Sequence, residues 1–311
     1  MRVARLGVGL VLAMLLAAGC LDPSPTPGSP DSTADLTLPG AVLHTSMGDV
    51  AWVFYPEAAP QTVAHISDLI RSHYYDGKGF GRVVPGHVIQ QVERDGGTLT
   101  DDKATVPLEA PQGFHFSAGA VGIARGEDPD SGGPEFFVMD YATSHLDGNY
   151  TVFAQVVEGL DVVHRIARVP AVAFPSPAQL LTDRMAVQPV TISTAELRDV
   201  TLPAKEAARL PLQVARNVRA GDYRHSLEWP HDLAAGRSAD LTWYVRPYNE
   251  TASLDTTLLT LSIDGLAVPF TPQPGLPDIL AFHWTPGTSG MHAATLALDR
   301  NALATLTIEV A

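Results

Sequence analysis

Two stretches of the chain carry side chains that could act on a peptide bond. Phe80 to Gln90 (FGRVVPGHVIQ) holds an arginine and a glutamine, and Gly132 to Asp140 (GGPEFFVMD) holds two adjacent phenylalanines. An arginine stays protonated at every physiological pH, so it donates strong hydrogen bonds but does no acid–base work. A fixed cationic donor beside a dry aromatic slot suits the twisting of an X-Pro bond. The isomers of that bond are close in free energy, but an amide rotates over a barrier of about 18–20 kcal/mol.

The chemistry expected of Arg82 is selective hydrogen bonding. Rotation of the bond breaks amide resonance and leaves a lone pair on the proline nitrogen, which then accepts a hydrogen bond much better than the planar form does. A donor at that point stabilises the transition state and raises the rate. A charged hydrogen bond contributes about 1.5–3 kcal/mol, or roughly 10- to 200-fold in rate. Gln90 would hold the substrate carbonyl or orient the arginine, and no cofactor is needed.

Short β-rich runs and two helical segments surround these side chains. Partial alternation over 41–48 and 49–55, with Met-Gly-Asp between, predicts a hairpin. Apolar residues recur at helical spacing in 60–73 and again in 160–167. Further strands are expected at 79–84, 87–92, 118–124, 135–139, 151–157 and 187–192. Many strands with two helices far apart in sequence predict a mostly β fold, a closed antiparallel barrel capped by helices.

Six motifs in this region resemble those of cyclophilin-type peptidyl-prolyl isomerases in order and spacing. They are TSMGDV, YYDGKGFGRVVPGHVIQ, VPLE, GAVGIAR, GGPEFFV and LDGNYTVFAQVVEGLDVV, and the resemblance covers about half of the chain. It implies an eight-stranded antiparallel barrel with a helix at each end, over residues 37–199. It also implies peptidyl-prolyl cis-trans isomerase activity with no cofactor and no metal.

The family's functional residues can be carried over by position. Its catalytic arginine falls on Arg82 and its active-site glutamine on Gln90. The second phenylalanine of its Gln-Phe-Phe motif falls on Phe137, which the resemblance places in the proline pocket, whereas Phe80 and Phe136 are expected in the core. The other substrate-facing positions are His87, Val88, Ala124, Arg125, Glu135, His145, Leu146 and Tyr150.

Much of the pocket rim departs from the family's pattern. His87 stands where an aromatic usually follows Pro-Gly, and Val88 stands where methionine is common. Glu135 replaces the usual glutamine, His145 a bulky aromatic, and Tyr150 a histidine. These changes predict an active but weaker or retuned isomerase. They also argue against tight binding of the family's inhibitor cyclosporin, because the indole donor it commonly uses is missing.

Simpler interpretations exist for several of these residues. Without the surrounding motifs, Arg82 would be a surface ion-pair partner and Gln90 a solvated strand residue. The acidic segment 127–130 lacks the ligand spacing of a calcium loop, so a solvated hairpin is preferred to a cation site. Four histidines in the second half of the chain are spaced in a way that does not require a metal: His225, His231, His283 and His292.

The first 20 residues resemble a bacterial-type lipoprotein signal. Arg2 and Arg5 precede an apolar run from Leu6 to Gly19, which is shorter than the roughly 20 residues of a membrane-spanning helix. The run ends in Leu-Ala-Ala-Gly-Cys, and Cys20 is the only cysteine, which excludes an internal disulfide. The resemblance implies cleavage and lipidation at Cys20. The alternative is an ordinary secretory signal with an incidental cysteine.

Residues 21–36 are expected to form a tether, because their Pro/Ser-rich start cannot bury enough apolar surface to offset ordering. The net charge is −14, which argues against binding of nucleic acid or anionic lipid. We therefore expect a folded protein held outside the cytoplasm, at the cell surface or in the periplasm, whose only membrane contact is a lipid anchor.

A second domain is expected over 202–311. It consists of short β-rich runs separated by Pro, Gly and Asp turns, with the clearest alternation at 241–245 and 259–263. The pattern resembles immunoglobulin-like β-sandwiches, in which Trp229, Trp243 and Trp284 would be core residues. This resemblance is to a fold class, so it implies no activity and identifies no partner for the domain.

The leading hypothesis is an isomerase that acts on proline-containing peptides or unfolded exported proteins. The reaction needs no ATP, which suits a location outside the cytoplasm. One alternative is a module that binds proline-containing segments without useful turnover. Another is a structural surface lipoprotein on the same scaffold. The presence of Arg82 and Gln90 favours catalysis, whereas His87 and Val88 are compatible with binding of proline-containing segments without turnover.

Overall fold

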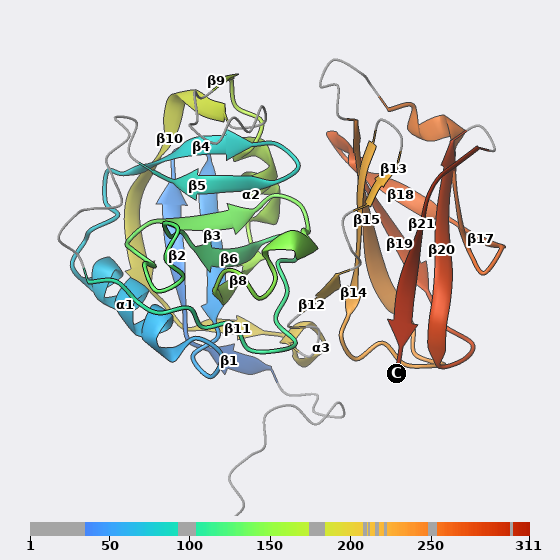
Figure 1. Ribbon diagram of the computed structural model, residues 1–311, viewed down its shortest axis with the longest axis horizontal. Helices are drawn as coiled ribbons and strands as arrows, with labels where there is room; N and C mark the ends of the chain where they lie inside the picture. The colour runs from blue at the N-terminus through green and yellow to red at the C-terminus, as the bar shows by residue number, and fades with distance from the viewer. Residues whose placement is uncertain are drawn as a thin grey trace, which may run out of the picture.

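The computed structural model describes residues 35–92, 104–173, 184–207, 210, 212–214, 218–220, 223–247, 254–298 and 301–311. The predicted signal with Cys20 and nearly all of the tether lie outside these ranges. Two bodies of β-strands are visible in Figure 1, one coloured blue to yellow and the other orange to red. Within the described ranges, no helix has the length and apolar character needed to cross a bilayer.

The first body is a closed antiparallel barrel, which confirms the predicted fold class. Its strands follow the order β2-β3-β8-β6-β7-β5-β4-β10, and β10 pairs back with β2 to close it. The strands are β2 Gly40–Thr45, β3 Gly48–Phe54, β4 Gly79–Val84, β5 Val88–Gln91, β6 Ala120–Ile123, β7 Phe136–Met139, β8 Val152–Glu158 and β10 Arg184–Leu197. Three short strands lie outside this ring: β9 Ala171–Ala173 pairs with β10, and β1 Leu36–Leu38 pairs with β11 Val200–Leu202.

The two predicted helices are present as α1 (Pro60–Arg71) and α2 (Leu160–Ile166). Pro60 occupies the first turn of α1, where its missing N–H would be unpaired in any case. Gly159 precedes α2 with φ +81°, and a Cβ there would lie 2.1 Å from the carbonyl oxygen of Asp49. Only glycine therefore lets α2 begin directly against β3. Three shorter helical segments are η1 Ser144–Leu146, α3 Ala204–Ala207 and η2 Thr256–Leu258.

The barrel interior is filled by alternate residues of its strands. Phe80 and Phe136 are fully buried there, as predicted, beside Trp52 and Phe153. Alternation along a strand sends every second side chain to the opposite face. Arg82, which lies next to buried Val83, is therefore directed to the outside of the barrel.

The second body contains two sheets that share one apolar core. The first sheet runs β12-β14-β15-β19-β18 with β13 also on β14, and the second runs β17-β16-β20-β21. The bounds are β12 Leu212–Val214, β13 Val218–Ala220, β14 Tyr223–Pro230, β15 Ala239–Pro247, β16 Leu259–Ile263, β17 Leu266–Val268, β18 Phe270–Gln273, β19 Leu276–Trp284, β20 Gly290–Leu298 and β21 Asn301–Val310. Trp229 and Trp243 are buried in this core and Trp284 packs against it. The immunoglobulin-like assignment itself stays a prediction.

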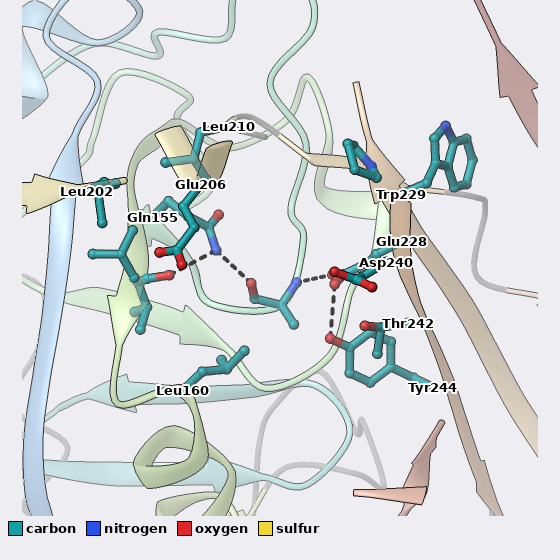
Figure 2. A pocket seen from close by; sticks show the side chains of 14 residues that line it. Gln155, Leu160, Leu202, Glu206, Leu210, Glu228, Trp229, Asp240, Thr242 and Tyr244 are labelled. Atoms are coloured by element: carbon teal, nitrogen blue, oxygen red, sulfur yellow. Dashed lines mark hydrogen bonds between the residues drawn. The ribbon is translucent and has the colours of Figure 1, made fainter. Parts of the chain in front are cut away.

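The two bodies contact each other through a buried seam. Tyr141 of the barrel lies against Tyr244 of β15 with ring centroids 4.7 Å apart. Glu228 of β14 accepts hydrogen bonds from the backbone N–H of Ala118 and from the Tyr244 hydroxyl, as Figure 2 shows. A cavity of about 310 Å³ opens beside this carboxylate, with Leu160 among its barrel-side lining.

Candidate active site

Neighbouring strands bring three of the predicted site residues into one row on the outside of the barrel. Arg82 of β4 pairs in register with Gln90 of β5, and Gln90 pairs with Phe137 of β7. Directly paired residues of antiparallel strands point to the same face. Four chain neighbours of these residues belong to the interior core: Val83, Ile89, Phe136 and Val138. Since alternate side chains of a strand point to opposite faces, Arg82, Gln90 and Phe137 project outward together.

A chain of hydrogen bonds connects the polar members of this row. Arg82 donates from Nη1 to Oε1 of Gln90 over 3.0 Å, and Gln90 donates from Nε2 to Oε2 of Glu135 over 3.1 Å. A carboxylate can only accept, so the amide N–H of Gln90 faces Glu135 and its oxygen faces Arg82. All three side chains are half-buried. This geometry suits one of the two roles expected of Gln90, that of orienting Arg82.

Phe137 forms the floor of the apolar part of the site. Its ring stacks on Phe116 with centroids 5.4 Å apart, and Tyr150 packs edge-on against it at 5.9 Å. Gly122 lies beneath the ring, and a Cβ at this position would come within 2.4 Å of Phe137 Cζ. The glycine is therefore needed for this packing. Only 5% of Phe137 is exposed, and both Phe116 and Tyr150 pack against its ring.

The rim above Phe137 comes from two turns. His87, half-buried after the Pro85-Gly86 turn, stacks on exposed His145 of η1 with centroids 5.6 Å apart. Leu146 packs against the outer apolar cluster, and Val88 is buried within it. This outer cluster comprises Tyr55, Ala58, Val84, Val88, Phe116, Ala120, Ala124, Phe137, Met139 and Val152. The structure thus brings Val88 and Leu146 into the same cluster as Phe137, and it stacks His87 on His145.

Arg125 and Ala124 border the site on the β6 side. The Arg125 guanidinium lies 4.5 Å from the centre of the Tyr150 ring and donates from Nε and Nη2 to the carbonyl oxygen of Asn149, over 3.1 and 2.9 Å. These contacts hold Tyr150 against Phe137. Ala124 is buried, and its backbone N–H donates to the carbonyl of Glu135 over 2.9 Å. Arg125 therefore acts on the pocket mainly through Tyr150.

A buried carboxylate holds the turn that leads into His87. Asp140 is fully buried and accepts from the backbone N–H of Gly86 over 2.6 Å, from His164 Nδ1 over 2.7 Å and from Arg168 Nη1 over 3.1 Å. Burial alone would raise the pKa of Asp140, but the His164 hydrogen bond and the Arg168 charge outweigh it and lower the pKa below its ordinary value. An ionised Asp140 thus anchors one side of the pocket.

Sequence reasoning did not single out Phe116, Gly122 or Asp140. Phe116 lies in an irregular segment with no periodicity to mark it. A glycine inside an apolar strand indicates close approach of another group, so Gly122 carried a usable signal. The sequence carried no such signal for Asp140, because its role depends on hydrogen bonds with Gly86 and Arg168, which are distant in sequence.

Comparison with known proteins decides the family. A profile described as "Cyclophilin type peptidyl-prolyl cis-trans isomerase/CLD" matches residues 41–197. The chain belongs to the cyclophilin-type peptidyl-prolyl isomerases. It is 36% identical over 138 residues to a probable peptidyl-prolyl cis-trans isomerase of Brucella abortus, covering 41% of this chain and 70% of the relative. It is 37% identical over 123 residues to peptidyl-prolyl cis-trans isomerase B of Bacillus subtilis, covering 39% and 85%.

Two further matches either cover a smaller share of the other protein or have a lower sequence identity to this chain. Peptidyl-prolyl cis-trans isomerase CYP71 of Arabidopsis thaliana is 33% identical over 148 residues, which is 44% of this chain but only 22% of that larger protein. The crystal structure of a Cryptosporidium parvum cyclophilin, obtained in the presence of the dipeptide Ala-Pro, aligns with a TM-score of 0.44 and 18% identity. That alignment covers 51% of this chain and 98% of the other. The family profile ends at residue 197, before the second body begins.

Proposed function

We propose that this cyclophilin isomerises X-Pro bonds with Arg82 as the catalytic donor. The observation that carries the proposal is the row formed by Arg82, Gln90 and Phe137, which sets a guanidinium beside an aromatic floor. The proline ring would lie on Phe137, and Gln90 would hold the guanidinium through its oxygen. Membership of the cyclophilin-type family supports peptidyl-prolyl isomerase activity.

The rate gain follows from differential binding. In the planar ground state the imide nitrogen has no free lone pair, so Arg82 gains little from it. At the twisted geometry the lone pair accepts the Arg82 hydrogen bond, which stabilises that state by about 1.5–3 kcal/mol. The half-buried position of Arg82 strengthens the interaction, because less water competes for the guanidinium.

The test is an isomerase assay, by coupled proteolysis or NMR exchange, on a short X-Pro peptide. Arg82→Ala should lower kcat/KM by about 10- to 200-fold, since it removes a charged hydrogen bond made in the transition state. Arg71→Ala is the matched control, because Arg71 lies on α1 with its side chain 62% exposed and bonds only Asp68 among the described contacts. Equal acceleration by wild type and Arg82→Ala would reject Arg82 as the catalytic group.

A second candidate function is proline-peptide binding without useful turnover. The low exposure of Phe137 beneath Tyr150 favours it, because a covered floor limits how deeply the proline can enter. This candidate predicts that the wild type binds a labelled X-Pro peptide but does not accelerate its isomerisation. Acceleration by the wild type would exclude it.

We further propose that the protein is exported, lipidated at Cys20 and assists the folding of other exported proteins. The support is the signal-like start and the lone cysteine. Detergent partitioning and intact mass should place the wild type in the detergent phase with added lipid mass, and Cys20→Ser in the aqueous phase. An aqueous wild type would contradict the anchor without affecting the isomerase proposal.

A further inference from the structure

The row that contains Arg82 continues on the side away from Gln90. Arg82 pairs in register with Met185 of β10, and Met185 pairs with Val172 of β9. Ala186, the next residue of β10, is buried in the interior core, so Met185 and its partner Val172 face outward like Arg82. In Figure 1, β9 lies above β4 at the top of the barrel.

This extension of the row is apolar and exposed. Val172 is 58% exposed, Val187 is 46% exposed, and Met185 is half-buried. Val187 follows buried Ala186 along β10, and its N–H donates to the carbonyl of Pro170 over 2.8 Å, which holds it beside β9. We name Val172, Met185 and Val187 the β9–β10 apolar surface. Contiguous exposed apolar patches rimmed by polar residues mark interaction sites in many proteins, whereas apolar residues scattered singly do not.

We propose that the β9–β10 apolar surface binds an apolar side chain of the substrate polypeptide, about three to six residues from the isomerised proline. The proposal rests on the proposed function, because the surface adjoins Arg82. Neighbouring strands are about 4.8 Å apart, so Val172 lies roughly 10 Å from Arg82 and roughly 19 Å from Phe137 across the sheet. An extended chain covers about 3.3 Å per residue, which gives the stated number of residues.

The substrate chain is favoured over a second copy of the protein as the occupant. A stable protein–protein interface buries about 800 Å² on each partner, far more than three side chains supply. Of the other large apolar side chains exposed in the described ranges, Leu258, Leu266 and Met291 belong to the second body. Leu36 lies on β1, which pairs with β11 and not with β9 or β10, so it does not extend this surface. The β9–β10 apolar surface is instead continuous with the row that carries Arg82 and Gln90.

The experiment compares a short X-Pro tetrapeptide with longer peptides. The longer peptides carry leucine, or serine as a control, four residues before or after the proline. For the wild type, one leucine peptide should have a KM about 3- to 10-fold below that of its serine counterpart at similar kcat, as expected for partial burial of one leucine. Val172→Asp and Val187→Asp should abolish this preference and leave turnover of the tetrapeptide unchanged.

Leu266→Asp is the matched control, because Leu266 is 74% exposed on β17 of the second body, and it should retain the preference. Equal KM values for the leucine and serine peptides with the wild type would overturn the proposal, as would a preference that survives Val172→Asp. A dimer that Val172→Asp dissociates would also overturn it, by assigning the surface to self-association.

If the wild type turns over no peptide, the proposed function fails while the surface is still tested. Fluorescence anisotropy of the labelled leucine peptide then replaces the rate. Weaker binding by Val172→Asp with the Leu266→Asp control unchanged supports the surface, and equal binding by all three proteins overturns it.

Discussion

Arg168 of the barrel lies 3.3 Å from Asp278 of the second body, measured from Nη2 to Oδ2. The same guanidinium bonds Asp140 through Nη1, and Asp140 accepts the N–H of Gly86 in the turn before His87. Tyr141 also donates its hydroxyl proton to Asp278. A continuous set of polar contacts therefore links the second body to the rim of the candidate active site.

Asp278→Asn should weaken this link. It removes the charge facing Arg168 in a seam where the two side chains are only 23% and 16% exposed, so a loss of about 1–3 kcal/mol in unfolding free energy is expected. Urea unfolding provides the measurement. Asp232→Asn breaks the more exposed Arg237–Asp232 pair and should cost less than about 1 kcal/mol. Similar losses in the two variants would show that the seam adds no special stability.

Glu228→Gln should change how stability depends on pH. Burial raises the pKa of Glu228 from 4.5 to about 7, against the opposing hydrogen bonds from Ala118 and Tyr244. Between these values the folded state keeps a proton that the unfolded state has lost, so the folded state loses stability as the pH rises. At 1.36 kcal/mol per pH unit the total loss is about 3 kcal/mol.

Glutamine has no charge to bury and still accepts from Ala118. The unfolding free energy of Glu228→Gln should therefore rise relative to wild type from about pH 5 to 7 and then stay level. Glu158→Gln, at an exposed carboxylate paired with Arg198, is the control and should follow the wild type. A constant difference between wild type and Glu228→Gln across this range would contradict the raised pKa.

Tyr150→His should increase isomerase activity. The Tyr150 ring packs at right angles to Phe137 with centroids 5.9 Å apart, and the Arg125 guanidinium lies 4.5 Å from the centre of the Tyr150 ring. The smaller imidazole, the usual residue of the family at this position, exposes more of the aromatic floor to the proline ring. We expect KM for a short X-Pro peptide to fall by about 3- to 10-fold, equivalent to about 1 kcal/mol of additional apolar contact. An unchanged or raised KM would mean that Tyr150 is itself a useful wall of the pocket.

Glu135→Gln should raise kcat modestly. The Glu135 carboxylate is one hydrogen-bonded residue away from Arg82, and its negative charge opposes the positive potential that the twisted imide needs. Two charges roughly 7 Å apart at a partly wet site interact by about 0.5–1 kcal/mol, so a gain of about 2- to 5-fold is expected. The gain should shrink in high salt, because exposed charges are screened. A gain that is independent of salt would point to a steric cause.

Local pattern was sufficient for the strands of the closed barrel, for its two helices and for the first contact of the site, but it gave no signal for the short strands β1, β9 and β11. The β4–β5 hairpin closes through Pro85-Gly86, so the pairing of Arg82 with Gln90 follows from a turn and two short strands. The same holds for α1, whose apolar spacing and leading proline are visible in the sequence. In these cases the interacting residues are near one another in the chain.

The chain by itself thus determined the barrel's strands, its helices and the hairpin that joins Arg82 to Gln90. Only the tertiary structure decided that Glu135 accepts from Gln90, that Tyr150 packs against Phe137, and that Asp278 is linked to the turn before His87 through Arg168 and Asp140. It also decided the partner of Arg82 on β10, where the register shifts between Met185 and Val190. The physical reason is that these contacts depend on strand register and barrel closure. Both depend on packing between residues far apart in sequence, and this packing cannot be read from local periodicity.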